Sequence, residues 1–506
     1  MINHIRTRNL PGKMLLSIFG LAVLVRIGLF LNFPVFVTED SPDYLRAAYD
    51  LFHNLDFSSI GLRDVRAPGY PLLLAATYPL TGMQSDRIVL LQSLIGLISL
   101  LLAMQLGRQL KSLPAAVALA LFLAFHPFLL LMEHAVMTEV LFLPFLLSFG
   151  ILSVLCLSGQ VNWLTGLLLG LNLAVCILIR PNALPFCAIL GAGGLYTVYL
   201  RDSRQTASPE KSIARAATIG VLRRAAYSHR FWQFCAAAML GAGLLVLPWM
   251  WRNYQLYDRF SIRNWNARHL FLMKVLNGTI DRQLPLLQKV NRQIGSDTPG
   301  YEWLWKLAEK YPTLEVEQIN QALYSEQIAA HPIWQVRDIL QSLVCFSGIC
   351  IFHASNERLA PKYWMHTVVR DPALTETLNR QAGLTLANPD YIYSSSRYHN
   401  WLILESWSWA GTLALAGLRP LLYFCFFGIL GLYTVFQVKG GTQKIKDKPF
   451  LQLQMAAIYI FGAGYLAMVA VHTAALSDSD RFALPFDLFA LAAVILALQH
   501  LWASSK

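Results

Sequence analysis

Three carboxylates lie close together directly after the first long apolar stretch of the chain, within the sequence TEDSPDYLRAA of residues 38–48. They belong to Glu39, Asp40 and Asp43. Carboxylates at the start of a helix are stabilised by the helix dipole, which gives them an ordinary structural explanation. A positioned carboxylate is also the group that takes a proton from a weak nucleophile in general base catalysis. The stretch therefore predicts either a helix start or an acid–base centre at a membrane surface.

A cationic helix start follows soon after, in RAPGYPLLLAATYPLTG of residues 66–82. Arg66 precedes a proline-started apolar helix of about a dozen residues, which is too short to cross a bilayer. We expect this helix to lie in the interface with Tyr70 and Tyr78 as anchors. The acidic and the basic helix start would then face the same interfacial water.

The elements that must position these residues are membrane helices. The chain has 506 residues, of which 56% are hydrophobic and only 14% are charged, and its mean hydropathy is +0.46. This composition excludes an ordinary soluble protein. Apolar runs of about 17 to 25 residues recur, and because a backbone in lipid must satisfy its own hydrogen bonds, they are predicted to be helices. About ten spans are expected, at residues 14–36, 88–107, 113–131, 136–157, 163–179, 183–200, 232–251, 412–436, 450–471 and 484–501.

Lysine and arginine collect before the first span, after the second, between residues 201 and 231, and between residues 439 and 448. All four clusters fall on one side when the spans alternate, and that side is predicted to be cytoplasmic, together with both termini. The formal net charge of +12 is explained by this topology, so no nucleic-acid partner is expected. The seven cysteines form no CxxC pair and indicate neither a disulfide framework nor a zinc site.

The predicted organisation has three parts. Residues 1–251 form an N-terminal transmembrane module whose first outer loop, 38–87, carries the candidate site. Residues 252–411 form a helical outer segment, with one helix expected between Pro312 and Pro332. Residues 412–506 form the C-terminal transmembrane helices. Residues 333–352 are apolar but contain Arg337 and Asp338, so we predict that they lie in the interface rather than span it.

Four further motifs follow these two helix starts along the chain. They are HAVMTEVLFLPFL with Glu139 at the start of a span, ILIRPNALPF with Arg180, LPWMWRNYQLYDRFSI with Arg252 and Asn253, and SDSDRFALPFDLFALAA with Arg481. In this order and sidedness, after the acidic loop and the R-x-PGYP helix, the chain resembles the GT-C superfamily of membrane glycosyltransferases. It resembles most the bacterial protein O-mannosyltransferase-like and aminoarabinose transferase-like enzymes. The resemblance covers most of the chain, except that the large outer β-domains of that family have no counterpart in residues 252–411.

The resemblance implies an all-α GT-C fold in the cell inner membrane with its active site on the periplasmic face. It implies transfer of a sugar from a polyprenyl-phosphate donor to a lipid, glycan or protein acceptor. Asp40 matches the family's first-loop catalytic aspartate, and one base with one displacement would invert the anomeric centre. Glu139 resembles the family's second acidic position and is the second catalytic candidate, which would either orient the acceptor or bind a divalent metal together with Asp40. Glu39 and Asp43 are second-line candidates, because the common Asp-Glu pair is replaced here by Glu39-Asp40-Ser41.

The leaving lipid phosphate needs cationic partners. The candidates are Arg66, Arg180, Arg252 and Arg481. Each has ordinary snorkelling at a helix end as its alternative explanation. Tyr70 and Asn253 are expected to line the substrate pocket. No organic cofactor is expected, and a divalent cation, Mg²⁺ or Mn²⁺, would be held by Asp40 and Glu139.

Two other classes of protein stay open. A lipid transporter or flippase is also polytopic, but it would place ionisable groups or broken helices near mid-membrane, often in two related halves. The predicted spans are expected to lack buried acidic residues, and the two halves of the chain look unlike. An O-antigen ligase or polymerase would depend on a late outer loop rather than on carboxylates after the first span. The effect of substituting Asp40 therefore distinguishes such an enzyme from a GT-C glycosyltransferase.

Overall fold

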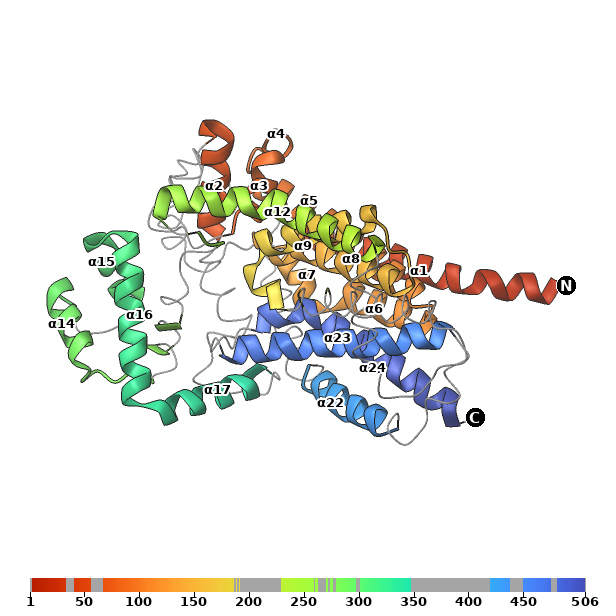
Figure 1. Ribbon diagram of the computed structural model, residues 1–506. Coiled ribbons are helices and arrows are strands. Elements are labelled where there is room, and N and C mark those ends of the chain that lie inside the picture. The colour runs from red at the N-terminus through yellow and green to blue at the C-terminus, as the bar shows by residue number, and fades with distance from the viewer. Residues whose placement is uncertain are drawn as a thin grey trace.

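The computed structural model describes residues 2–32, 41–55, 67–185, 188, 191, 229–258, 260–262, 270–271, 274–275, 279–296, 301–346, 419–436, 449–474 and 480–505. The regular elements of this described part are helices, in agreement with the predicted all-α class (Figure 1). They are α1 (Ile2–Asn32), α2 (Ser41–Asn54), α3 (Gly69–Ala76), α4 (Tyr78–Thr81), α5 (Ser85–Gln109), α6 (Leu113–Phe125), α7 (Pro127–Glu133), α8 (Glu139–Leu157), α9 (Trp163–Ile179), α12 (His229–Tyr257), α14 (Pro285–Ile294), α15 (Tyr301–Lys310), α16 (Thr313–Ala330), α17 (Pro332–Phe346), α22 (Arg419–Phe436), α23 (Pro449–Ala474) and α24 (Asp480–Ser505), with a 3-10 turn at Pro181–Ala183.

Five of these helices are long and apolar enough to cross a membrane. The stretches concerned are Gly12–Leu31, Asp86–Gln109, Glu139–Leu157, Trp232–Leu256 and Pro485–Trp502. Shorter apolar helices accompany them at Leu113–Phe125, Trp163–Ile179, Leu421–Val435 and Leu453–Ala467. The helices indicate an integral membrane protein that crosses the bilayer several times. The span expected at 183–200 extends beyond the described residues.

Close contacts between helices fix their relative directions. A Cβ on Gly166 of α9 would lie 2.5 Å from the carbonyl oxygen of Phe234, and one on Gly170 would lie 2.0 Å from that of Ala238. The residue numbers rise together along the two helices, so α9 and α12 run parallel and end at the same end of the bundle. Glycines four residues apart that let two backbones approach are a common device of membrane helices.

Helices α8 and α24 also run parallel. The rings of Phe142 and Phe486 lie 5.6 Å apart between centroids, and farther along both helices Gly150 lies against Phe489. The starts of α8 and α24 and the ends of α9 and α12 therefore gather at one end of the bundle, here called the site end. Both chain termini lie at the other end in Figure 1. Which of the two ends is cytoplasmic stays a prediction.

The predicted span at 113–131 is two helices rather than one. Helix α6 ends at Phe125 and α7 begins at Pro127, while His126 between them is extended at φ −65° and ψ 114°. A residue before proline is pushed out of the helical region by a clash with the ring, so this dipeptide ends α6. Because Pro127 has no N–H, the carbonyl of Leu123 accepts instead from Arg26 Nη2 at 3.3 Å.

The helix expected at 66–82 is also divided. Thr77 separates α3 from α4, and Gly82, at φ 55°, ends α4 in the left-handed conformation that glycine adopts without strain. Pro79 in the first turn of α4 has no N–H to donate back into α3, which explains the break.

A buried polar network ties the C-terminal helices to the α5–α6 turn at the end remote from the site end. Gln454 Nε2 donates to the carbonyl of Leu110 at 2.8 Å, so its Oε1 accepts from His500 Nε2 at 3.0 Å. His500 Nδ1 then accepts from the hydroxyl of Tyr433, also at 3.0 Å. All three side chains are buried, and each link is satisfied.

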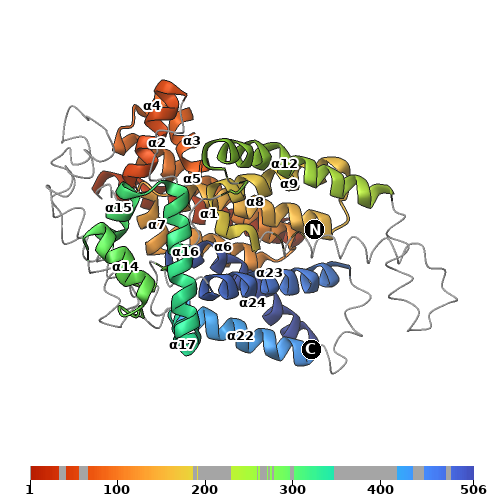
Figure 2. The same ribbon diagram turned by 60° about the vertical axis from the view of Figure 1, so that its left-hand side comes forward.

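The outer segment has a small hydrophobic core of its own. Buried Trp303, Leu287, Leu307 and Leu323 hold α14, α15 and α16 together. Figures 1 and 2 show these helices grouped beside the bundle, on the side away from the termini, and α17 leads from α16 to a contact with α23. Helix α16 confirms the prediction of a helix between Pro312 and Pro332. The domain boundaries at 251 and 411 stay predictions.

Candidate functional site

The predicted site residues are described to different extents. Those with described side chains are Tyr70, Glu139, Arg180, Arg252 and Asn253. Asp43 and Arg481 lie on α2 and α24, where only the backbone is described. Glu39, Asp40 and Arg66 lie outside the described residues.

Glu139 and Arg180 form a buried ion pair at the site end. Glu139 opens α8, where the helix dipole favours a carboxylate. Arg180 caps α9 in an extended conformation because it precedes Pro181, which ends the helix. Arg180 Nη1 lies 3.3 Å from Glu139 Oε1, and the two side chains are only 6% and 3% exposed. The Thr138 hydroxyl adds a donor to Glu139 Oε2 at 3.3 Å.

The connection that leads to Glu139 is buried although it is not helical. Its carbonyl groups must find partners, because unpaired backbone groups away from water are costly. Gln92 Nε2 of α5 donates to the carbonyls of Glu133 and Ala135, both at 2.8 Å. The Ser41 hydroxyl at the start of α2 donates to the carbonyl of Val136 at 3.0 Å. The first outer loop is thereby bound to the backbone just before Glu139.

Tyr70 completes this arrangement from α3. Its hydroxyl donates to Gln92 Oε1 at 2.5 Å, and its ring meets that of Tyr44 edge-on at 5.2 Å. Burial, with the nearby Tyr44 and Glu139 adding to it, raises the pKa of Tyr70 well above its usual value, so the hydroxyl stays a donor. The prediction that Tyr70 is an interfacial anchor is wrong, because the side chain is fully buried. Its expected role in a substrate pocket stays a prediction.

We expect Tyr70→Phe to lower the free energy of unfolding by about 1–3 kcal/mol, because it leaves the buried Gln92 Oε1 without its donor. Tyr78→Phe is the matched control, since that hydroxyl lies 3.1 Å from Nε2 of the exposed His53. A change there should stay within about 0.5 kcal/mol. Thermal unfolding of both variants in one detergent measures the difference. Equal losses would contradict a special role for the Tyr70–Gln92 hydrogen bond.

Helix α3 also approaches the end of α9 closely. A Cβ on Gly69 would lie 2.6 Å from Cγ1 of Ile179 and 3.0 Å from its backbone nitrogen. Ile179 is the last residue of α9, directly before Arg180. The glycine of the R-x-PGYP motif therefore lets α3 pack beside the Glu139–Arg180 pair.

Arg252 and Asn253 lie at the same end but form their own cluster. Arg252 Nη1 donates to Asn253 Oδ1 at 2.8 Å, and the guanidinium lies 4.7 Å from the Trp249 ring centroid. Asn253 Nδ2 and Trp249 Nε1 donate to the carbonyls of Ser261 and Ile262, at 2.8 Å and 3.0 Å. Because α9 and α12 run parallel, Arg252 lies within about one helical turn of the level of Arg180. The pocket role expected for Asn253 stays a prediction.

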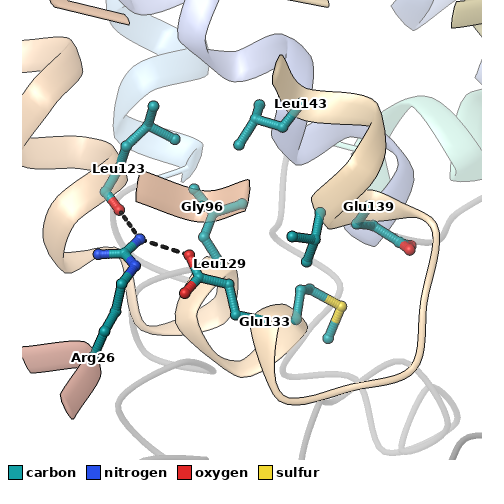
Figure 3. Close-up of a pocket in the computed structure, with 9 residues that line it drawn as sticks. Arg26, Gly96, Leu123, Leu129, Glu133, Glu139 and Leu143 are labelled. Carbon is teal, nitrogen blue, oxygen red and sulfur yellow. Dashed lines mark hydrogen bonds and ion pairs between the residues drawn. The ribbon is translucent and has the colours of Figure 1, made fainter. Parts of the chain in front are cut away.

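A second buried ion pair was not predicted. Arg26 Nη2 of α1 lies 2.6 Å from Glu133 Oε1, and the two side chains are 4% and 6% exposed. Gly96 of α5 makes room, since a Cβ there would lie 2.1 Å from Glu133 Oε1. The pair lines a cavity of about 10 Å³, enough for about one water molecule. Figure 3 shows the lining residues, with the Glu139 carboxylate turned away from the pair.

Asp487 corrects the expectation that the spans lack buried acidic residues. It lies on α24 within the predicted span 484–501, is 1% exposed, and accepts from the Tyr465 hydroxyl at 3.0 Å. Its neighbour Phe486 packs on Phe142, over which the Arg180 guanidinium lies at 5.9 Å. The sequence signal was an aspartate inside an apolar run, which by itself marks a functional candidate. Arg26 carried the same signal in the first span.

The described residues do not assemble a metal site. In that part of the chain, no group of three or more His, Cys, Asp or Glu side chains gathers around one point. Of the expected ligands only Glu139 is described, and its carboxylate faces the Arg180 guanidinium at 3.3 Å. A divalent cation at that carboxylate would meet an existing positive charge.

Comparison of the chain with protein-family models, with curated proteins and with solved structures finds no match.

Proposed function

We propose that this chain is a membrane glycosyltransferase that moves a sugar from a polyprenyl-phosphate carrier to a hydroxyl acceptor. One observation carries the proposal: the first outer loop is bound through Ser41 and Tyr70 to the connection before Glu139, and Glu139 is paired with Arg180. An acidic group of α8 and a basic group at the end of α9 thus meet beside the first outer loop. This is the arrangement that acid–base chemistry on a charged lipid requires.

In the proposed reaction Asp40, covalently next to Ser41, takes the proton of the acceptor hydroxyl. The acceptor oxygen forms a bond to the anomeric carbon while the bond from that carbon to the carrier phosphate oxygen breaks. The phosphate leaves with the bonding electron pair, and the single displacement inverts the anomeric centre. Glu39, Asp43 or Glu139 would take the place of Asp40 if its substitution had no effect.

The leaving phosphate would be stabilised first by Arg180. A guanidinium has five N–H donors in a fixed fork, so it can bind Glu139 and a phosphate oxygen at once. Its burial strengthens the interaction because the local dielectric is low. Arg252, at the same end of the bundle, would bind the same phosphate. Arg66 and Arg481 complete the proposed cationic set.

The proposal also covers the fold, the number of spans and their orientation in the membrane. It comprises a GT-C fold with about ten transmembrane helices in the cell inner membrane, cytoplasmic termini and a periplasmic active site. The parallel pairing of α9 with α12 supports it, because that pairing places Arg180 and Arg252 at one end of the bundle. The acceptor would be a lipid, a glycan or a protein.

The test compares purified wild type with Asp40→Asn in lipid. Both are given labelled polyprenyl-phosphate sugars and a membrane and periplasmic extract as acceptor source, and release of free polyprenyl phosphate is scored. We expect wild type to release carrier and Asp40→Asn to be slower by about 10²–10⁴-fold, the usual contribution of a general base. Asp50→Asn, on the same helix α2, is the matched control and should keep its rate. A wild-type protein that turns over none of the donors would contradict the proposal.

A lipid transporter or flippase is the second candidate, because Asp487 is a buried carboxylate inside a predicted span. Such groups mark substrate and ion pathways in transporters. The same preparation separates the two candidates when the carrier lipid is placed in one leaflet of a vesicle. Movement of lipid to the other leaflet without release of free carrier, lost in Asp487→Asn, would favour the transporter.

A further inference from the structure

Helix α17 exposes its apolar side. Ile333, Val336 and Leu340 are 79%, 58% and 56% exposed. Their spacing of three and four residues places them on one side of the helix, together with Arg337, whose side chain is 58% exposed. These four residues are here called the α17 stripe.

On the opposite side of α17, Asp338 is buried in an ion pair. Asp338 Oδ2 lies 2.6 Å from Lys274 Nζ, and the two side chains are 0% and 1% exposed. The Thr279 hydroxyl donates to the same oxygen at 2.8 Å. A helix at the surface of a soluble protein has the reverse distribution, with its apolar side in the core and its polar side in water. The inversion indicates that the medium around the α17 stripe is not water.

The exposure of the stripe matches that of the membrane helices nearby. On α22, Leu421, Phe424 and Leu432 are 60%, 63% and 65% exposed. Helix α17 contacts α23, which packs in the same bundle of apolar helices. The stripe therefore continues a surface whose natural partner is lipid.

Arg337 sets the depth of this contact. A guanidinium is costly in the hydrocarbon core but binds lipid phosphate readily at the headgroup level. It lies 5.8 Å from the Trp334 ring centroid, and Trp334 stacks on His331 at 4.1 Å. Tryptophan beside arginine is typical of the membrane–water boundary. The positive charge and the apolar neighbours fit a phospholipid surface together.

We propose that α17 is the membrane anchor of the outer segment. Its stripe enters the headgroup–acyl boundary of the leaflet at the site end, and Arg337 binds a lipid phosphate. The Lys274–Asp338 pair connects this anchor to α14–α16, because Phe271 of the same segment packs on Trp303 and Gln327 Nε2 of α16 donates to the Thr279 carbonyl. The proposal stands independently of the transferase activity.

Site-directed spin labels test the occupant of the stripe. Val336→Cys and Leu340→Cys would be labelled in a background without the seven native cysteines, in vesicles of phosphatidylethanolamine and phosphatidylglycerol. We expect both labels to collide freely with oxygen, which concentrates in lipid, and rarely with a water-soluble nickel chelate. Gln318→Cys and Gln321→Cys, exposed on α16, are the matched controls and should show the reverse. Stripe labels accessible to the chelate, or shielded from both reagents by a protein partner or a second copy, would overturn the proposal.

A second measurement is made on protein that keeps its native cysteines, so it does not depend on the cysteine-free background. Added phosphatidylglycerol should raise the thermal midpoint of the wild type in detergent, and Arg337→Gln should lose most of that gain. Arg292→Gln, an exposed arginine on α14 that donates to its own helix, should keep it. An equal gain in wild type and Arg337→Gln would overturn the phosphate contact.

Discussion

Arg180→Met is expected to abolish measurable sugar transfer, and Glu139→Gln is not expected to restore it when the two are combined. Loss of one donor to a developing negative charge typically slows an enzyme by about 10²–10³-fold. Loss of Arg180 also leaves Glu139 as an uncompensated buried charge, which costs about 3–5 kcal/mol of stability. The double variant removes both charges, so we expect it to recover stability but not transfer. Carrier release and thermal unfolding, measured on the same preparations, separate the two effects.

The matched control for the Arg180 and Glu139 variants is His500→Leu. It breaks a buried network at the opposite end of the bundle, between Tyr433 and Gln454. We expect a loss of stability of about 1–3 kcal/mol with unchanged turnover per folded molecule. If the double variant regained transfer together with stability, the Glu139–Arg180 pair would be structural only, and the phosphate would have to be bound by Arg66, Arg252 or Arg481.

Much of the fold could be predicted from apolar run length. The residues 163–179 expected to form one span are the residues of α9, because Asn162 caps its start and Arg180-Pro181 ends it. Hydropathy alone does not reveal the break at His126, because the apolar run continues on both sides of this residue. The break comes from the proline that follows it. The helix directions could not be predicted, since they depend on contacts such as Gly170 against Ala238, which hydropathy does not encode.

The candidate site was predicted unevenly. Glu139 and Arg180 were named on separate motifs, and the structure brings them to 3.3 Å. Gln92 was missed because a lone glutamine in an apolar helix carries no motif, although it makes three of the hydrogen bonds that hold the site together. Tyr70 was placed in the interface because tyrosines favour that position, but its hydroxyl finds a buried partner instead. Such partners come from distant segments and cannot be read from local spacing.

Gly170→Ala should separate α9 from α12. The added Cβ would lie 2.0 Å from the carbonyl oxygen of Ala238, which is backbone and cannot rotate away. Relief requires the two helices to move apart, which would also loosen their close packing at Gly166 and Gly241. We expect a loss of about 1–3 kcal/mol in stability, the usual cost of overpacking. Thermal unfolding in one detergent measures it.

Gly20→Ala in α1 is the matched control, because nothing lies within 4 Å of the position where its Cβ would be. Alanine is the better helix former, by up to about 1 kcal/mol, so the same substitution should leave stability unchanged or raise it. Opposite signs for one chemical change would show that backbone contact, rather than helix propensity, decides the outcome. Arg180 caps the end of α9 and Arg252 lies near the end of α12, so separation of the two helices should also move the two guanidinium groups apart. If the proposed function is right, Gly170→Ala therefore lowers carrier release by more than it lowers the amount of folded protein. If the contact between α9 and α12 is only structural, carrier release and folded protein should fall in proportion.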